Sequence, residues 1–195
     1  MMRFARVAKP GGFVEAEARG ARWLADHPEA KRAYPYWSPF RSELAGGFGQ
    51  LCAYGAMYEP VGTVDHFVSR NEDRAKSYDW DNYRFASQWI NSSKQSLRSG
   101  EVLDPFDVDD AWFEILLPSL QLVATDAVPE AERERVEQML IRLHLRDDER
   151  ILRQRREWYR MYQDHELTLA GLRKKAPLIA RAVDRHERAH AGRRA

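Results

Sequence analysis

The spacing of apolar and polar residues predicts a chain that is mostly helical. Residues 13–26 place apolar side chains at helical intervals, with inward positions expected at Phe13, Ala16, Ala21 and Leu24. This helix should end at His27, because the residue before a proline avoids the α region. Residues 129–143 predict another long helix, with a proline in its first turn and glutamates near its positive end. Its apolar positions form one face that should be buried: Val136, Met139, Leu140 and Leu143.

Two further helices are expected toward the C-terminus. Either Asp147 or Asp148 should cap the first of them, which contains Ile151 and Trp158. Residues 176–190 predict the last helix.

Short strands are expected between these helices. Residues 2–7 alternate apolar and basic side chains, as a half-buried strand does. Residues 120–125 also predict a strand. Residues 111–117 fit either a strand or a buried helical turn, because they contain too few β-branched residues to decide.

Residues 34–40 form an aromatic segment that prolines interrupt. Its rings are suited to stacking on nucleic-acid bases, but we favour the interpretation that they hold a loop against the core. Ser38 is placed to cap a short helix that reaches Leu44 and that Gly46-Gly47 ends.

Residues 51–94 contain the candidate catalytic and metal-binding residues. Residues 63–67 are typical of a strand and include Asp65, which offers a hard oxygen to a divalent metal, and His66, a base with a pKa near neutrality. Residues 79–82 fit a second strand or a loop, and the pattern from Tyr83 onward predicts a helix. Asn91 and Lys94 lie three residues apart on that helix and so share a face. The expected order is therefore strand, strand, helix.

Each of these residues also has an ordinary structural explanation. Asp65 and His66 fit a surface pair at a strand end, Asn82 fits a helix cap or a turn, and Asn91 with Lys94 fits a solvent-facing helix surface. Only their joint spacing favours a functional site.

Composition limits the class of protein. A chain of 195 residues with 44% hydrophobic residues is expected to form a single domain with a real core. It contains no apolar run long enough to span a membrane, and its N-terminus lacks the apolar region of a secretory signal. Cys52 is the single cysteine, which excludes an internal disulfide and fits a cytoplasmic protein.

Charge is unevenly distributed along the chain. Residues 150–195 contain 13 Lys/Arg and 5 Asp/Glu, a net +8, whereas the remainder has 18 and 25, a net −7. Such a basic tail is a candidate contact for a polyanion, although a solvated helix face is the more common explanation of a charge run.

The C-terminal sequence His186-Glu187-Arg188-Ala189-His190 matches the zinc motif H-E-x-x-H. We reject it as the active site. It lies five residues from the C-terminus of the sequence, where helices fray, and nothing downstream supplies the third protein ligand that zinc requires.

Residues 51–94 resemble the HNH nucleases, whose ββα-metal motif, also called a His-Me finger, has the same order of elements. That family closes its first strand with an acidic residue and a histidine, places an asparagine before the helix, and completes the site with a histidine or asparagine on the helix. The matching residues here are Asp65-His66, Asn82 and Asn91. The resemblance implies a predominantly helical α+β fold, with this motif embedded between N- and C-terminal helices.

Many HNH proteins have two Cys-x-x-Cys pairs that hold a structural zinc ion. The matching positions here are Cys52, Gly55, Ser87 and Ile90, so three of the four cysteines are lost. No structural zinc is therefore expected. We expect packing by Tyr54, Trp89 and Ile90 to replace it, with Cys52 as a small buried residue.

The resemblance also implies roles for the remaining residues. Asp65 and Asn91 would hold a divalent metal, Mg²⁺ or Mn²⁺ rather than Zn²⁺, and His66 would act as the general base. Asn82 would hold the loop and fix the orientation of His66. The cations expected to contact phosphates are Lys94, Arg84 and Arg98.

The resemblance extends past the motif, to bacterial HNH proteins of roughly this length that lie beside ATPases in anti-phage and retron-associated loci. Leu103-Asp104-Pro105 and Leu143-His144-Leu145 resemble later segments of those proteins. The expected function is a metal-dependent DNA endonuclease, with DNA and an ATPase subunit as partners. The alternative is an HNH-derived module that binds nucleic acid or a partner without cleaving.

A division of the single domain follows from this resemblance. Residues 1–46 form an N-terminal segment, residues 47–100 the HNH core, and residues 101–195 a helical extension that ends in the basic tail.

Overall fold

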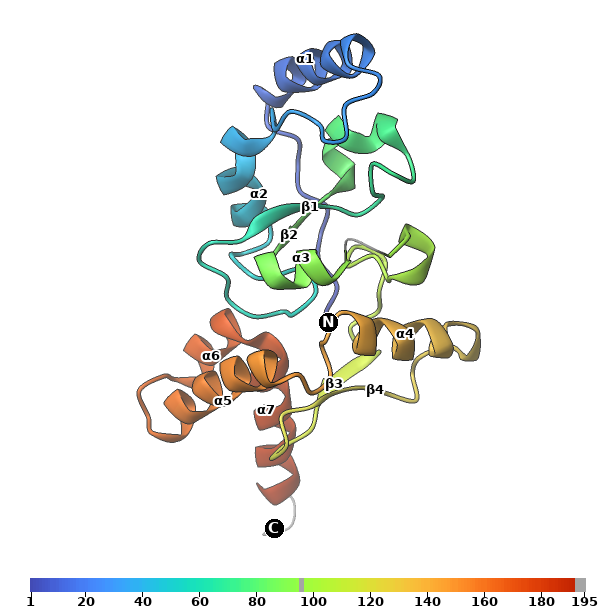
Figure 1. The fold of residues 1–195 in the computed structure, drawn as a ribbon. Coiled ribbons are helices and arrows are strands. Elements are labelled where there is room, and N and C mark those ends of the chain that lie inside the picture. Colours follow the sequence, from blue (N-terminus) through green and yellow to red (C-terminus); the bar gives the residue numbers. More distant parts are fainter. Residues whose placement is uncertain (95–96, 192–195) are drawn as a thin grey trace.

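The computed structural model describes residues 1–94 and 97–191 and has an α+β fold rich in helices (Figure 1). The α-helices are α1 (Phe13–Asp26), α2 (Arg41–Gly47), α3 (Gln88–Lys94), α4 (Glu130–Arg142), α5 (Glu149–Gln163), α6 (Leu169–Lys175) and α7 (Pro177–Ala191). The strands are β1 (Thr63–His66), β2 (Tyr83–Ala86), β3 (Phe113–Ile115) and β4 (Leu122–Ala124). Short 3-10 turns are η1 (Ser38–Phe40), η2 (Arg74–Tyr78), η3 (Trp80–Asn82) and η4 (Ser99–Glu101).

The elements separate into two groups along the long axis of the molecule. Helices α1, α2 and α3 surround the β1–β2 pair, and α4 to α7 gather with β3 and β4 at the other end (Figure 1). Buried apolar side chains from both groups form one connected cluster. In the part of the chain that the structure describes, no helix is both long and apolar enough to cross a membrane.

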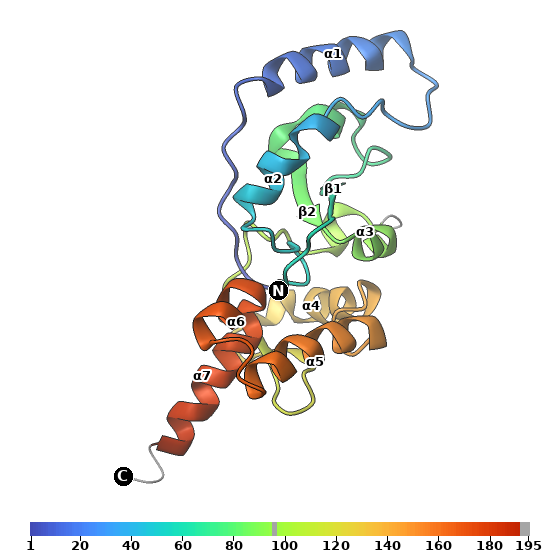
Figure 2. The same cartoon turned by 90° about the vertical axis from the view of Figure 1, so that its left-hand side faces the viewer.

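The N-terminal segment connects the two groups. It runs in an extended form from the middle of the molecule to α1 (Figure 2). The Phe4 amide donates to the Pro105 carbonyl at 2.8 Å, and Trp80 Nε1 donates to the Val7 carbonyl at 2.9 Å. The strand predicted for residues 2–7 is wrong, because the backbone groups of this segment bond to a loop carbonyl and to a side chain and not to a neighbouring strand.

Helix α1 matches its predicted bounds, but its buried face differs from the prediction. Phe13 and Ala16 are buried as expected, whereas Ala21 is exposed and Gly20 takes the inward position. A Cβ atom at Gly20 would lie 2.3 Å from the Tyr78 ring. Glycine is therefore needed there for the close approach of α1 to η2.

Strands β1 and β2 pair antiparallel, with Asp65 opposite Arg84 and His66 opposite Tyr83. The helix predicted to start at Tyr83 is wrong, because Tyr83–Ala86 is β2 and α3 begins at Gln88. All four β2 residues are buried, Arg84 included, so the strand lacks the alternation of a half-exposed strand. Tyr83, Ala86 and Ile90 lie at intervals of three and four residues, and this spacing predicts a helix. Residues 79–82 form no strand: Trp80–Asn82 is the 3-10 turn η3, and the Asp79 side chain caps it.

The C-terminal half follows the sequence pattern more closely. Residues 111–117 contain β3, and residues 120–125 contain β4, its antiparallel partner. The four apolar residues predicted for the buried face of α4 are all buried, the last of them, Leu143, directly after the helix. Asp148 is the residue that caps α5, because its side chain accepts a hydrogen bond from the Arg150 amide. Ser38 makes no cap with its side chain; it begins η1, and α2 follows directly.

Candidate active site

Helix α3 packs across β1 and brings two of the predicted site residues against it. Asn91 Nδ2 donates to the Val64 carbonyl at 3.5 Å. Lys94 Nζ donates to the His66 and Phe67 carbonyls at 2.8 and 3.0 Å. The spacing of three residues therefore places both side chains on the face that meets the strand, and not on a solvent-facing surface.

Asp65 is buried, and both of its carboxylate oxygens have donors. Oδ2 accepts from the Tyr54 hydroxyl at 2.6 Å, and Oδ1 accepts from Lys94 Nζ at 3.2 Å. Burial and the negative charge of Asp65 raise the pKa of Tyr54 well above its usual value. Tyr54 is therefore a neutral donor, and Lys94 supplies the positive charge beside Asp65.

His66 is half-buried and lies in a different environment from Asp65. Its Nε2 lies 2.9 Å from the Ser77 carbonyl, which only accepts hydrogen bonds, so Nε2 holds the proton and Nδ1 holds the lone pair. The ring meets Trp37 and Tyr83 edge-on, with centroids 4.6 and 4.9 Å apart. Burial lowers the pKa of His66, which keeps the imidazole neutral and able to accept a proton near pH 7.

The side chains of Asp65 and His66 share none of these partners. Asp65 contacts Tyr54 and Lys94, whereas His66 contacts Ser77, Trp37 and Tyr83. Neighbouring residues of a strand point to opposite faces, and this alternation persists at the end of β1.

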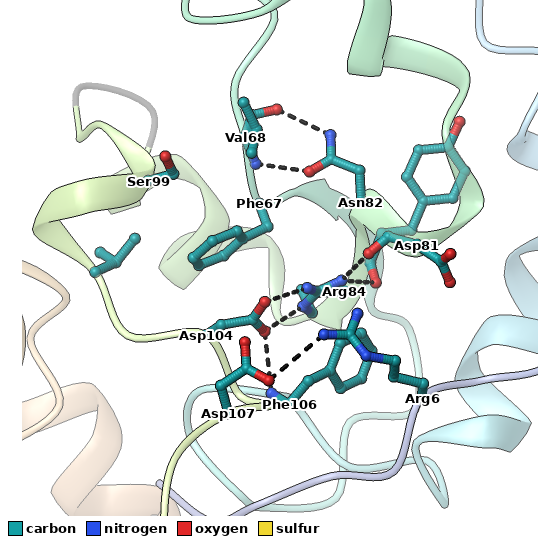
Figure 3. A network of polar contacts seen from close by, with 12 residues as sticks. Arg6, Phe67, Val68, Asp81, Asn82, Arg84, Ser99, Asp104, Phe106 and Asp107 are labelled. Atoms are coloured by element: carbon teal, nitrogen blue, oxygen red, sulfur yellow. Dashed lines mark hydrogen bonds and ion pairs between the residues drawn. The ribbon is translucent and has the colours of Figure 1, made fainter.

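Asn82 fixes the long loop between β1 and β2 (Figure 3). Its Oδ1 accepts from the Val68 amide at 2.7 Å, and its Nδ2 donates to the Val68 and Lys76 carbonyls at 2.9 and 3.0 Å. The structure thus agrees with the predicted loop-holding role. None of these bonds reaches the His66 ring, so any effect of Asn82 on the orientation of His66 passes through the loop and stays a prediction. The Ser77 carbonyl, next to Lys76, holds the ring.

We expect Asn82→Ala to lower the free energy of unfolding by about 2–3 kcal/mol, because three hydrogen bonds of a buried amide are lost. Urea denaturation measures the change. Asn71→Ala, at an exposed position in the same loop, is the matched control and should stay within about 0.5 kcal/mol of the wild type. Equal effects of the two substitutions would contradict the role given to Asn82.

Arg84 was predicted to contact phosphate, and the structure contradicts this. Its side chain is only 2% exposed and forms a two-pronged ion pair with Asp104, with Nε–Oδ1 and Nη2–Oδ2 distances of 2.8 and 2.5 Å (Figure 3). Nη1 donates to two backbone carbonyls, and the guanidinium carbon lies 3.7 Å from the Phe106 ring centroid. Arg84 therefore joins β2 to the segment Leu103-Asp104-Pro105.

Lys94 is also unsuited to the predicted phosphate contact. Its ammonium is buried against Asp65 and two backbone carbonyls. Arg98 is exposed, and its proposed contact with nucleic acid stays a prediction.

The four positions that match the zinc cysteines of the HNH family meet at one place. Cys52 Sγ accepts from the Gly55 and Ser87 amides, both at 3.4 Å, and lies 3.7 Å from Ser87 Oγ. A Cβ atom at Gly55 would lie 3.5 Å from Ile90 Cδ1 and 3.7 Å from Cys52 Sγ. Segments 35 residues apart in the sequence thus come together at Cys52.

The surroundings of this cluster agree with the expected apolar packing. Tyr54 and Ile90 are buried, and Trp89 is half-buried against the core, with the Arg150 guanidinium over its ring. The prediction that Cys52 is a small buried residue is confirmed. Burial also raises the pKa of its thiol.

A divalent cation fits the candidate site only when it takes the place of the Lys94 ammonium. Within residues 1–94 and 97–191, no three His, Cys, Asp or Glu side chains form a group suited to a metal ion. Asp65 Oδ1 already contacts the Lys94 ammonium, a positive charge that also contacts two carbonyl oxygens. Oxygen is the ligand type that Mg²⁺ and Mn²⁺ prefer. Asn91 donates through Nδ2, so Oδ1 is the atom it would offer.

The H-E-x-x-H sequence lies on the exposed end of α7. The rings of His186 and His190 have centroids 4.3 Å apart, but the Glu187 carboxylate accepts from the Tyr162 hydroxyl at 2.5 Å. Nearby arginines of the basic tail form ion pairs on the surface, such as Arg185 with Glu114. Residues 192–195 of the tail lie outside the described residues.

Sequence reasoning missed several partners of the site. Tyr54 was expected only as packing, although it donates to Asp65. Trp37 was assigned to a loop against the core, and Ser77 was not considered, yet both contact His66. The segment Leu103-Asp104-Pro105 was the one signal that pointed to Asp104, the partner of Arg84.

In comparisons with known proteins, no protein-family model matches the chain, and no curated protein matches it either.

Proposed function

We propose that this chain is a metal-dependent endonuclease of the HNH type that hydrolyses phosphodiester bonds of DNA. The meeting of Cys52, Gly55, Ser87 and Ile90 supports this most strongly. A chance match to Asp65-His66, Asn82 and Asn91 would not bring four further positions together beside the start of the helix. The antiparallel β1–β2 pair followed by α3 also has the expected order.

His66 is the proposed general base. Because Nε2 donates to the Ser77 carbonyl, Nδ1 is the atom that accepts a proton from the attacking water. The lowered pKa of His66 keeps it in the basic form at neutral pH. Asp65 and Asn91 are the residues that would hold the divalent cation, which stabilises negative charge on the phosphate and the leaving oxygen when bound.

The proposal includes a role in anti-phage defence, as the nuclease subunit that acts with an ATPase. It rests on the resemblance to bacterial HNH proteins beside ATPases. The contact of Asp104 with Arg84 supports the outer part of that resemblance only, because it joins the segment Leu103-Asp104-Pro105 to β2.

A plasmid-nicking assay tests the proposal. The wild type should convert supercoiled plasmid to open circles with Mg²⁺ or Mn²⁺ and stop when a chelator is added. His66→Ala should reduce the rate by at least about 100-fold, as expected for removal of a general base. His186→Ala, an exposed histidine of the H-E-x-x-H sequence, is the matched control and should cut at the wild-type rate.

Two results of that assay would overturn the proposal. The first is a wild type that leaves the plasmid intact with both metals. The second is a His66→Ala variant that cuts as fast as the wild type. Circular dichroism and melting temperature should accompany each variant, since His66 packs against Trp37 and Tyr83.

One observation favours the second candidate, a module that binds nucleic acid or a partner without cleaving. Both oxygens of Asp65 already have donors, and the Asp65 and His66 side chains face different partners. This candidate predicts an intact plasmid together with DNA binding that weakens steeply as salt rises.

A further inference from the structure

The Lys94 ammonium lies among three oxygen acceptors. Nζ contacts Asp65 Oδ1 at 3.2 Å, the His66 carbonyl at 2.8 Å and the Phe67 carbonyl at 3.0 Å. An ammonium has three N–H donors, so each donor has one acceptor. The Lys94 and Asp65 side chains are 3% and 4% exposed, and solvent therefore screens their attraction weakly.

Lys94 is the positive charge that neutralises Asp65. The other donor to this carboxylate, Tyr54, is a neutral phenol. Arg84 stands opposite Asp65 in the sheet, but its guanidinium is paired with Asp104. The Phe67 ring centroid, 5.6 Å from Lys94 Nζ, adds a further favourable contact for a cation.

We infer that Lys94 is the resident counter-ion of Asp65, and that a divalent cation binds Asp65 by displacing the Lys94 ammonium. Two cations on one buried carboxylate repel each other strongly, because the surroundings have a low dielectric constant. Lys94 is thus a positioning residue that holds α3 against β1 and competes with the metal. This inference deepens the proposed function, since it concerns the same site.

The test compares thermal unfolding and Mn²⁺ binding of the wild type and Lys94→Met. Without metal, Lys94→Met should lower the melting temperature by roughly 6–20 °C, because Asp65 keeps a buried charge without its partner. Mn²⁺ should recover most of this loss in the variant and shift the wild type much less. Mn²⁺ should also bind Lys94→Met at least about tenfold more tightly than the wild type.

Two control variants make the result specific. Lys76→Met removes a lysine that pairs with Asp79 on the surface, and should change neither the melting temperature by more than about 4 °C nor the Mn²⁺ affinity. The double variant Asp65→Asn/Lys94→Met removes both charges, so it should be more stable than Lys94→Met and should not respond to Mn²⁺. If Lys94→Met does not fold, Lys94→Gln replaces it.

The inference is overturned if the Lys94 variant and the wild type bind Mn²⁺ with equal affinity and Mn²⁺ leaves the stability of the variant unchanged. Neither measurement uses DNA. A chain that never cuts DNA can still show the exchange of cations, and an active nuclease can lack it, so the two proposals fail separately.

Discussion

The triple variant Gly55→Cys/Ser87→Cys/Ile90→Cys is expected to bind one zinc ion with a Kd on the order of nanomolar or below. With Cys52 it supplies two Cys-x-x-Cys pairs, the ligand set of a tetrahedral structural zinc site. The new Cβ atom at Gly55 would lie in ordinary contact with Ile90 and Cys52, and Ile90→Cys removes the nearer of these neighbours. The Ser87 amide and hydroxyl both contact Cys52 Sγ in the wild type, so a thiol at position 87 would lie close to that sulfur.

Competition with a chromophoric chelator measures the affinity, and Co²⁺ absorption reports four thiolate ligands. Zinc should raise the melting temperature of the triple variant, and a chelator should lower it again. The same variant with Cys52→Ser lacks the fourth thiolate and should bind zinc far more weakly. Failure of the four-cysteine chain to bind zinc better than the wild type would show that these positions are not the remnant of a zinc site.

The wild type, which lacks three of the four cysteines, should not depend on a metal for its stability. Apolar packing of Tyr54 and Ile90 holds its core together, so a chelator should stop DNA cleavage without lowering the melting temperature. Collapse of the wild-type fold on chelation would mean that the lost cysteines were misinterpreted.

Arg84→Met is expected to cost about 3–5 kcal/mol of unfolding free energy, the usual effect of breaking a buried ion pair from one side. The substitution leaves Asp104 without its cation and removes the donor to the Asp81 and Tyr83 carbonyls. Urea denaturation measures the loss. Since Arg84 joins β2 to the segment after α3, nuclease activity should fall together with stability.

Arg6→Met is the matched control for this experiment. Arg6 also lies over the Phe106 ring and pairs with an acidic residue, Asp107 (Figure 3). The Arg6 and Asp107 side chains, however, are 56% and 67% exposed. Its loss should cost at most about 1 kcal/mol. Adding Asp104→Asn to Arg84→Met should recover part of the stability, because the uncompensated charge is removed. Similar losses for Arg6→Met and Arg84→Met would contradict a buried role for Arg84.

The long helices α1, α4 and α7 were predictable from the sequence to within a residue at each end, but strand β2 and the start of α3 were not. Strand β1 and the helix with Asn91 and Lys94 follow from local pattern. Strand β2 is not recognisable from its pattern, because it is buried on both faces, even at Arg84, and so lacks the alternation of a half-exposed strand. The extended residues 2–7 were misread because alternation does not reveal whether a partner strand exists.

The roles of the cations were the least predictable part of the site. In the sequence, Lys94, Arg84 and Arg98 are alike, since each is a basic residue near Asn91. Burial separates them: Lys94 pairs with Asp65, Arg84 with Asp104, and Arg98 is exposed. The partners lie 29 and 20 residues away in the chain, so only the tertiary fold distinguishes an internal cation from a phosphate contact.

The buried thiol of Cys52 provides a reporter of how often the core opens. It is the single cysteine of the chain, it is 3% exposed, and burial raises its pKa. A thiol reagent therefore reacts with the folded protein only through molecules in which the Cys52–Ser87 contact has separated. The labelling rate of wild type, Arg84→Met and Lys94→Met would thus follow local opening at one atom, without any introduced probe.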